Sequence, residues 1–257
     1  MNGRPATIGR VAPGREVTAR WYAGAHNGAT APLSILRAVV PQPVLDIALL
    51  IGGYLVGSLP MGVLVARLTG ARDPRTVGSG RTGGTNALRA MGIRRALTVA
   101  ALDVAKGGLP VLAAIALGAT PLIQALTGVA AVLGAWRSVF LRFHGGRGVA
   151  TGIGGLLVIQ PLVVLLGAPA FFIVIWLTRY ISLGSLLAAV GAVLLLAAFV
   201  WAGANDPAAL VFGVLAGALV WLAHSDNIVR LLRGEERRFE WSARDREPSA
   251  DGGADTG

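Results

Sequence analysis

A stretch rich in glycine, arginine and small polar side chains lies between residues 78 and 89. Four glycines fall within its first seven residues, so the backbone can turn sharply and present successive N–H groups to an anion. Hydroxyl, amide and guanidinium groups supply further donors for phosphate oxygens. The stretch therefore predicts a phosphate-binding loop, and a flexible basic loop that only sets membrane orientation is the alternative. The expected contacts are Ser79, Gly80, Arg81, Thr85, Asn86 and Arg89.

The same glycines, Gly78, Gly80 and Gly83, match the G-x-G-x-x-G spacing of dinucleotide-binding folds. That motif requires a strand before it, whereas an apolar segment long enough for a membrane helix precedes this loop. The spacing therefore does not predict dinucleotide binding.

A second glycine turn, Gly145-Gly146-Arg147-Gly148, leads into a short apolar segment. Free N–H groups at a helix start beside an arginine suit a phosphate group. We therefore expect Gly145, Gly146 and Arg147 to bind phosphate. The alternative is a tight connector between two membrane spans.

Three polar residues at the end of the last apolar segment, His224, Asn227 and Arg230, are spaced so that they can share one flank of a helix. The alternative is an interfacial amphipathic helix whose arginines reach toward water. Ser182 is a further candidate donor to phosphate, but serine at a helix start is more often an N-cap, which is the favoured interpretation.

Asp103 and Lys106 are charged residues inside an apolar segment. Charges in such a segment are costly, so they usually face a partner or a wet cavity. The two residues are three apart on one helix face and can pair. We predict an ion pair, which either supports the site or is purely structural near the cytoplasmic end of the segment.

Membrane helices must position these groups, because the composition is too apolar for a soluble domain. Of the 257 residues, 54% are hydrophobic and only 14% are charged. The formal net charge is +10, and Lys106 is the sole lysine, so arginine carries almost all of the positive charge. In a membrane protein such charge sets orientation and binds anions, so no nucleic-acid partner is expected. The absence of cysteine excludes disulfides and cysteine metal sites.

Six apolar segments are near the roughly 20 residues needed to cross a bilayer. A seventh, over 148–159, is shorter and either crosses or re-enters. If it crosses, all arginine-bearing connections after the first span lie on one side, as the positive-inside rule requires. We therefore predict an all-α integral membrane protein with seven transmembrane helices, the N-terminus outside and the C-terminus cytoplasmic. The six longer segments are 44–68, 96–117, 121–140, 161–177, 183–202 and 207–223.

The two ends of the chain differ from this membrane domain of 44–239. Residues 1–43 contain five Arg, one Glu and several Gly and Pro, with no apolar run of signal-peptide length. We expect an N-terminal extension without stable structure there. The tail over 240–257 is expected to be disordered too, because its end is rich in Gly and Asp.

With these elements in this order, the chain resembles the acyl-phosphate:glycerol-3-phosphate acyltransferase family of bacterial inner membranes (the PlsY type). Five motifs, taken together, carry the resemblance over nearly all of the membrane part. They are Gly57-Ser58-Leu59-Pro60-Met61-Gly62, the loop from Gly78 to Arg89, Asp103-x-x-Lys106-Gly107, the stretch from Gly145 to Thr151, and His224-x-x-Asn227-Ile228-x-Arg230-Leu231.

The resemblance implies transfer of a fatty acyl group from acyl phosphate to the 1-hydroxyl of glycerol 3-phosphate. The products would be lysophosphatidic acid and inorganic phosphate, formed on the cytoplasmic face of the cell membrane. It implies no cofactor and no metal. The partners would be the two substrates, membrane lipid, and an enzyme that makes acyl phosphate.

On this resemblance, two groups of residues are expected to form the site. Ser79, Thr85, Asn86, Arg89 and Arg147 would hold phosphate groups, and Ser182, His224 and Asn227 would complete the pocket. The expected catalytic residues are His224, Ser79 and Asn227. The proton of the attacking hydroxyl could pass to His224 or to an oxygen of the acyl phosphate, and both routes stay open.

The chain departs from the family pattern at several positions. The family's Gly-His pair before the second glycine turn is Gly134-Ala135 here, which bears on any contact made by that histidine. Arg147 stands where the family usually has lysine, which keeps the charge but alters its geometry. The other departures are Arg81 for Asn, Gly84 for Ala and Ser138 for Pro.

A transporter of phosphate esters or other anions is the main alternative function. Such a protein would be expected to show inverted repeats and polar sites near the membrane midplane. The sequence has no clear internal repeat, and nearly all its polar motifs lie at one predicted face. These features favour the enzyme.

Overall fold

The computed structural model describes residues 39–239, and all regular structure within that range is helical. The predicted tail over 240–257 and all but the last five residues of the predicted extension over 1–43 lie outside the described residues. In chain order the helices are α3 Gln42–Gly57, α4 Met61–Leu68, α5 Gly84–Ala116, α6 Pro121–Trp136, α7 Val149–Ile159, α8 Pro161–Thr178, α9 Ile181–Trp201, α10 Ala208–Ala223 and α11 Ser225–Leu232, with short 3-10 turns at Pro74–Thr76 and Val139–Leu141.

Four of these helices are each long and apolar enough to cross a membrane. The count rises to six if each of two bent pairs, α3 with α4 and α10 with α11, is one span. The shorter segment predicted over 148–159 forms helix α7. These helices agree with the predicted all-helical membrane fold.

The first predicted span is broken rather than continuous, because α4 bends by 48° from α3. Pro60 lies at the break, where it cannot donate a helical hydrogen bond. Two side chains from elsewhere satisfy carbonyl groups there. Ser138 Oγ donates to Ser58 O at 2.6 Å, and Lys106 Nζ donates to Leu59 O at 2.9 Å.

The stretch predicted as a loop between residues 78 and 89 is helical from Gly84 onward, which corrects that expectation. Gly92 interrupts this helix with φ 78° and ψ 175°, a conformation that glycine adopts without a Cβ clash. Thr85, Asn86 and Arg89 therefore lie on the first turns of a helix and not in a flexible loop.

Helix α7 runs between two chemically different ends of the bundle. It begins directly after Arg147 and Gly148, in a basic connection. Its other end lies beside the connection before α10, because Gln160 Nε2 donates to Asn205 Oδ1 at 3.1 Å. Both connections at that end lack Lys and Arg. Helix α7 therefore joins an arginine-bearing connection to an arginine-free one.

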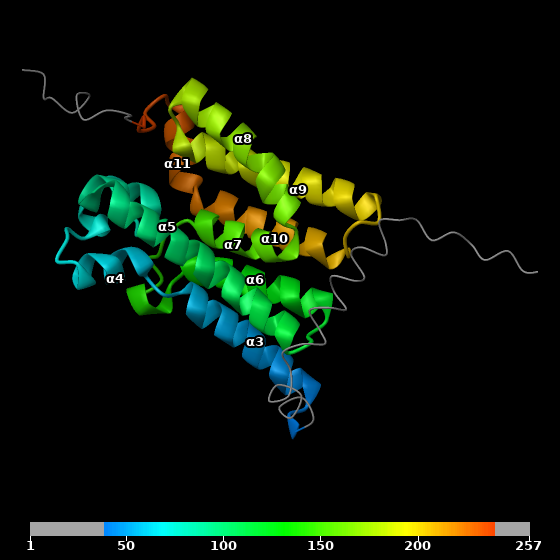
Figure 1. Cartoon of the computed structure of the whole chain (residues 1–257). Helices are drawn as coiled ribbons and strands as arrows, with labels where there is room; N and C mark the ends of the chain where they lie inside the picture. The colour runs from blue at the N-terminus through cyan, green and yellow to red at the C-terminus, as the bar shows by residue number, and fades with distance from the viewer. Residues whose placement is uncertain (1–38, 240–257) are drawn as a thin grey trace, which may run out of the picture.

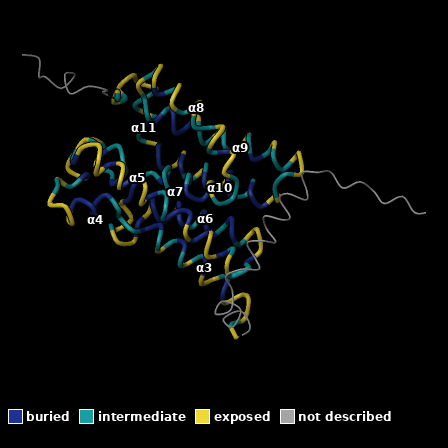
Figure 2. Tube along the Cα trace, viewed as in Figure 1, coloured by how far each residue is buried: buried dark blue, intermediate teal, exposed yellow. Residues whose placement is uncertain are grey.

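Helices α5, α6, α7 and α10 pack closely together and form the interior of the bundle (Figure 1). Gly107 of α5 lies against the backbone of Thr151, and Gly154 of α7 lies against the backbone of Val104. Small residues permit this approach where lipid provides no driving force between helices. Helices α8 and α9 have few buried residues and expose many large apolar side chains, as expected for a lipid-facing surface (Figure 2).

Candidate active site

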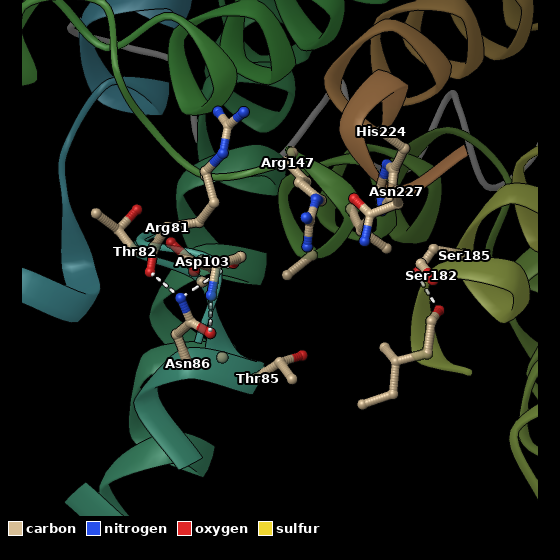
Figure 3. Close-up of a pocket in the computed structure, with 18 of the residues that line it drawn as sticks. Arg81, Thr82, Thr85, Asn86, Asp103, Arg147, Ser182, Ser185, His224 and Asn227 are labelled. Carbon is tan, nitrogen blue, oxygen red and sulfur yellow. Dashed lines mark hydrogen bonds between the residues drawn. The ribbon is translucent and has the colours of Figure 1, made fainter. Parts of the chain in front are cut away.

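A polar cavity of about 320 Å³ lies at the end of the bundle where the basic connections meet (Figure 3). The first glycine loop, the second glycine turn, the start of α9 and helix α11 all contribute to its wall. The cavity brings together every predicted site residue except Gly80 and Gly145. Those that line it are Ser79, Arg81, Thr85, Asn86, Arg89, Asp103, Lys106, Gly146, Arg147, Ser182, His224, Asn227 and Arg230.

The buried side chain of Asn86 organises the first glycine loop. Its Nδ2 donates to Ser79 Oγ at 3.1 Å and to Arg81 O at 2.9 Å. Its Oδ1 accepts from Ser79 N at 3.4 Å and from Arg89 Nη1 at 3.3 Å. Gly78, with φ 56°, packs against the same oxygen, so a larger residue would be strained there. Asn86 thus fixes the two groups, Ser79 and Arg89, that were expected to bind phosphate.

Two helix N-termini face this cavity. Gly83 precedes α5 and Gly148 precedes α7, and both line the wall together with the first residues of their helices. The first amides of a helix lack partners within it, and the helix dipole makes this end positive. A Cβ on Gly146 would lie 3.9 Å from Gly83 N, so the two starts are close neighbours. Such an arrangement suits a phosphate group.

The amides of the second glycine turn have protein partners in this structure. Gly145 N donates to Trp136 O at 3.0 Å, and Gly146 N donates to Ala135 O at 2.8 Å. These bonds tie the turn to the end of α6. The turn therefore serves to place Arg147 and the start of α7 at the cavity.

Arg147 is held by an acidic residue of α11. Its Nη2 lies 3.3 Å from Asp226 Oδ2, which lies 3.3 Å from Arg230 Nη2 as well. Burial lowers the pKa of the Arg147 guanidinium and Asp226 opposes that shift, but a guanidinium keeps its charge in proteins. Arg147 Nε is buried without a partner among the described residues. Because Arg147 lines the cavity, its guanidinium can donate to an anion bound there.

A buried carboxylate, Glu236, gathers three donors in the cavity wall. Its Oε1 accepts from Ser182 Oγ at 2.8 Å and from Asn227 Nδ2 at 2.6 Å. Its Oε2 accepts from Arg230 Nε at 2.9 Å. The favoured interpretation of Ser182 as an N-cap is wrong, because Tyr180 occupies the cap position of α9 and the Ser182 hydroxyl turns to Glu236.

His224 lies at the 61° bend between α10 and α11 and is only 2% exposed. Its Nδ1 is 2.7 Å from Val220 O. A carbonyl oxygen only accepts, so we assign the ring proton to Nδ1, which leaves Nε2 as an acceptor when the ring is neutral. Asn227 Oδ1 is buried without a partner among the described residues. Both side chains line the cavity and offer acceptors suited to a hydroxyl group.

The predicted pairing of Asp103 and Lys106 is confirmed. Lys106 Nζ lies 2.7 Å from Asp103 Oδ1, and the two side chains are 7% and 11% exposed. Since Lys106 also donates to Leu59 O, the pair connects α5 to the broken first span beside the cavity.

Ala135 lines the cavity, so the position where the related family has histidine carries only a methyl group in this chain. Several other polar wall residues were not predicted as contacts, among them Thr82, Thr151, Glu236 and Arg237. Glu236 follows an equally acidic Glu235, and no spacing in the sequence distinguishes the buried carboxylate from the exposed one.

An apolar cavity of about 210 Å³ adjoins the polar one. It lies among α7, α8, α9 and α10. The two cavities share four wall residues, Val149, Ile153, Phe171 and Ser185. A ligand with a charged head and an apolar tail could therefore occupy both.

Comparison with known proteins identifies similar chains. Residues 47–234 match the family model described as glycerol-3-phosphate acyltransferase. A glycerol-3-phosphate acyltransferase of Thermus thermophilus is 47% identical over 189 residues, which cover 72% of this chain and 91% of the relative. Glycerol-3-phosphate acyltransferase 3 of Dehalococcoides mccartyi is 41% identical over 203 residues, covering 74% and 94%.

Solved structures agree with these relatives. A crystal structure of PlsY (YgiH), an integral membrane glycerol 3-phosphate acyltransferase, in its glycerol 3-phosphate form is 37% identical with a TM-score of 0.69. The match covers 76% of this chain and 96% of that one. The lysophosphatidic acid form of PlsY gives a TM-score of 0.68 at 36% identity, covering 76% and 95%.

Proposed function

Because this chain belongs to the glycerol-3-phosphate acyltransferase family, we propose that it transfers a fatty acyl group from acyl phosphate to the 1-hydroxyl of glycerol 3-phosphate. The products are lysophosphatidic acid and inorganic phosphate. The observation that carries this proposal is the polar cavity, with its guanidinium groups and two helix N-termini, joined to an apolar cavity. Acyl phosphate combines an anionic head and a long apolar tail, which is the combination that these two cavities suit.

The proposed reaction forms one ester bond and breaks one mixed-anhydride bond. The 1-hydroxyl oxygen attacks the carbonyl carbon of acyl phosphate, and the bond from that carbon to the phosphate oxygen breaks. Phosphate leaves with the electron pair of that bond. The hydroxyl proton passes to His224 Nε2 or to an oxygen of the phosphate. Since acyl phosphate is already activated, positioning and charge stabilisation can supply most of the acceleration.

The residues have distinct roles under this proposal. Arg147, Arg89 and the start of α7 hold phosphate charge, and Ser79 donates from the loop that Asn86 fixes. Asn227 Oδ1, which is buried and unpaired among the described residues, accepts from a hydroxyl of glycerol 3-phosphate. Thr85 completes the phosphate-binding wall, and Ser182 positions the Asn227 amide through Glu236.

Under the same proposal the chain crosses a bacterial cell membrane seven times, with the cavity on the cytoplasmic face. The charge pattern supports this topology, because the arginine-bearing connections gather at the cavity and Gln160 meets Asn205 at the arginine-free end. Helix α7, with 11 residues, is only about 16 Å long. If it crosses the membrane, the cavity at its start lies deeper in the membrane than the ends of the longer neighbouring helices. An enzyme that makes acyl phosphate must supply the donor.

Reconstitution of the pure protein tests the proposal. With palmitoyl phosphate and glycerol 3-phosphate, we expect release of inorganic phosphate and formation of lysophosphatidic acid in equal amounts. Product from acyl-CoA and none from acyl phosphate would overturn the donor assignment. Uptake of labelled glycerol 3-phosphate into vesicles without acylation would favour transport instead.

A further inference from the structure

Arg81 belongs to the first glycine loop, and its backbone is held in place there. Its carbonyl oxygen accepts from Asn86 Nδ2 at 2.9 Å, and the next residue, Thr82, is buried. Arg81 is partly buried and lines the polar cavity (Figure 3). Within residues 39–239, its side chain has no hydrogen bond or ion pair. The guanidinium is therefore available to a ligand.

The ion pairs of the cavity do not compensate the charge of Arg81. Asp226 contacts Arg147 and Arg230, and Glu236 contacts Arg230 as well. Two carboxylates thus balance two guanidinium groups, so this cluster is formally neutral. A phosphate monoester carries about 1.5 to 2 negative charges at neutral pH. Arg81 adds a positive charge that the cluster does not neutralise, and such a charge attracts an anion.

Arg81 and Arg147 come from two turns that touch each other. A Cβ on Gly146 would lie 3.5 Å from Thr82 Oγ1, so the residues beside the two arginines are neighbours. Burial is the main cause that lowers the pKa of the Arg147 guanidinium, and the charge of Arg81 lowers it further. The two like charges therefore repel each other, which costs stability until an anion lies between them.

We propose that Arg81 and Arg147 hold one substrate phosphate between them, and that Arg81 determines how tightly this enzyme binds it. The inference rests on the proposed function, because the ligand is the phosphate of glycerol 3-phosphate or that of acyl phosphate. Each guanidinium fork can donate a pair of hydrogen bonds to phosphate oxygens. The related family usually has asparagine at position 81 and lysine at position 147, neither of which offers such a fork. The arginine pair therefore distinguishes this chain from the usual pattern.

Three variants separate the contact made by Arg81 from the net charge of the protein. Arg81→Gln removes the guanidinium but keeps a polar side chain, and Arg81→Lys keeps the charge without the fork. Arg94→Gln is the matched control, because Arg94 is exposed on α5 and does not line the cavity. All measurements use the full chain in nanodiscs.

Thermal unfolding with inorganic phosphate, compared with potassium chloride at equal ionic strength, measures anion binding without turnover. Phosphate at about ten times its Kd should raise the melting temperature of the unchanged protein by roughly 2–4 °C. Arg94→Gln should show the same rise, and Arg81→Gln should show little or none. In potassium chloride, Arg81→Gln should melt no lower than the unchanged protein, because the repulsion from Arg147 is gone.

Steady-state kinetics identify which phosphate the arginine pair holds. Arg81→Gln should raise KM about 10- to 100-fold for one substrate, the loss expected for a charged hydrogen bond, while kcat changes little. A rise for glycerol 3-phosphate assigns the pair to the acceptor, and a rise for palmitoyl phosphate assigns it to the donor. Arg81→Lys should lose less, and Arg94→Gln should match the unchanged protein.

The results distinguish failure of this inference from failure of the proposed function. Unchanged KM for both substrates in Arg81→Gln, or equal losses in Arg94→Gln, would overturn the inference alone. The same holds if phosphate stabilises Arg81→Gln as much as the unchanged protein, or stabilises neither. A lower melting temperature of Arg81→Gln in potassium chloride would also overturn it, because Arg81 would then support the fold. No turnover of acyl phosphate by the unchanged protein would overturn the proposed donor, whereas a phosphate-dependent rise that requires Arg81 would still support the anion site.

Discussion

Lys106 Nζ donates to the main-chain oxygen of Leu59 at 2.9 Å while it pairs with Asp103 at 2.7 Å. One ammonium group thus satisfies a carbonyl at the break between α3 and α4 and neutralises a buried carboxylate of α5. Leu59 O also accepts from Met61 N at 3.0 Å, so the ammonium adds a second bond to this carbonyl and ties the break to α5. The ion pair therefore holds the wall of the active site in shape.

Replacing Lys106 by methionine should destabilise the protein by about 3–5 kcal/mol, because Asp103 would keep a buried charge without a partner. The double variant Asp103→Asn, Lys106→Met should recover part of that loss. Thermal unfolding in detergent measures both. If Lys106→Met were as stable as the double variant, an unpaired charge on Asp103 would not be the cause of the lost stability.

The loss caused by replacing Arg147 should be smaller when the new side chain still contacts phosphate. Arg147→Ala should lower kcat/KM by roughly 10- to 100-fold, the range expected when a charged hydrogen bond is lost. Arg147→Lys should lose less, since it keeps the charge but not the fork-shaped donors. Arg233→Ala, at an exposed position in α11's C-cap, is the control and should change little. Equal effects at positions 147 and 233 would contradict the assignment.

His224→Ala distinguishes the two proton routes. If Nε2 of this histidine accepts the hydroxyl proton, kcat should fall by about 100-fold or more, while KM for both substrates changes little. The pH dependence of kcat should also lose its acidic limb, because no ring remains to be protonated. Near-normal turnover with unchanged phosphate affinity would rule out His224 as the base and leave the acyl phosphate oxygens as proton acceptors.

Glu236 should act through the residues it positions. In Glu236→Ala, Ser182, Asn227 and Arg230 lose their common acceptor, so we expect KM for glycerol 3-phosphate to rise by about tenfold or more. Glu235→Ala removes an equal charge from an exposed neighbour and should be near neutral. Glu236→Gln should fall between them, since its amide oxygen still accepts. A loss of activity equal in the two alanine variants would point to net charge instead.

The sequence was sufficient to predict the helices and most of the polar residues that line the cavity, for reasons that particular residues illustrate. Apolar length predicts spans directly, and the spacing of Asp103 and Lys106 predicts their pairing because both lie on one helix. The contacts at the break beside Pro60 and the role of Ser182 involve segments far apart in the chain. Ser138, Lys106 and Glu236 make those contacts, and local pattern contains no information about such partners.

The crossing of α5 and α7 gives the last prediction. A Cβ on Gly107 would overlap the carbonyl of Thr151, a backbone atom that cannot move without shifting the start of α7. Gly107→Ala should therefore cost about 1–3 kcal/mol and also lower activity, because α7 begins at the cavity beside Arg147. Gly52→Ala in α3 is the matched control, since an added Cβ there has no atom within 4 Å and alanine favours the helix. Thermal unfolding and turnover should separate the two variants. Equal stability of the two variants would show that the crossing of α5 and α7 has room for a Cβ at position 107.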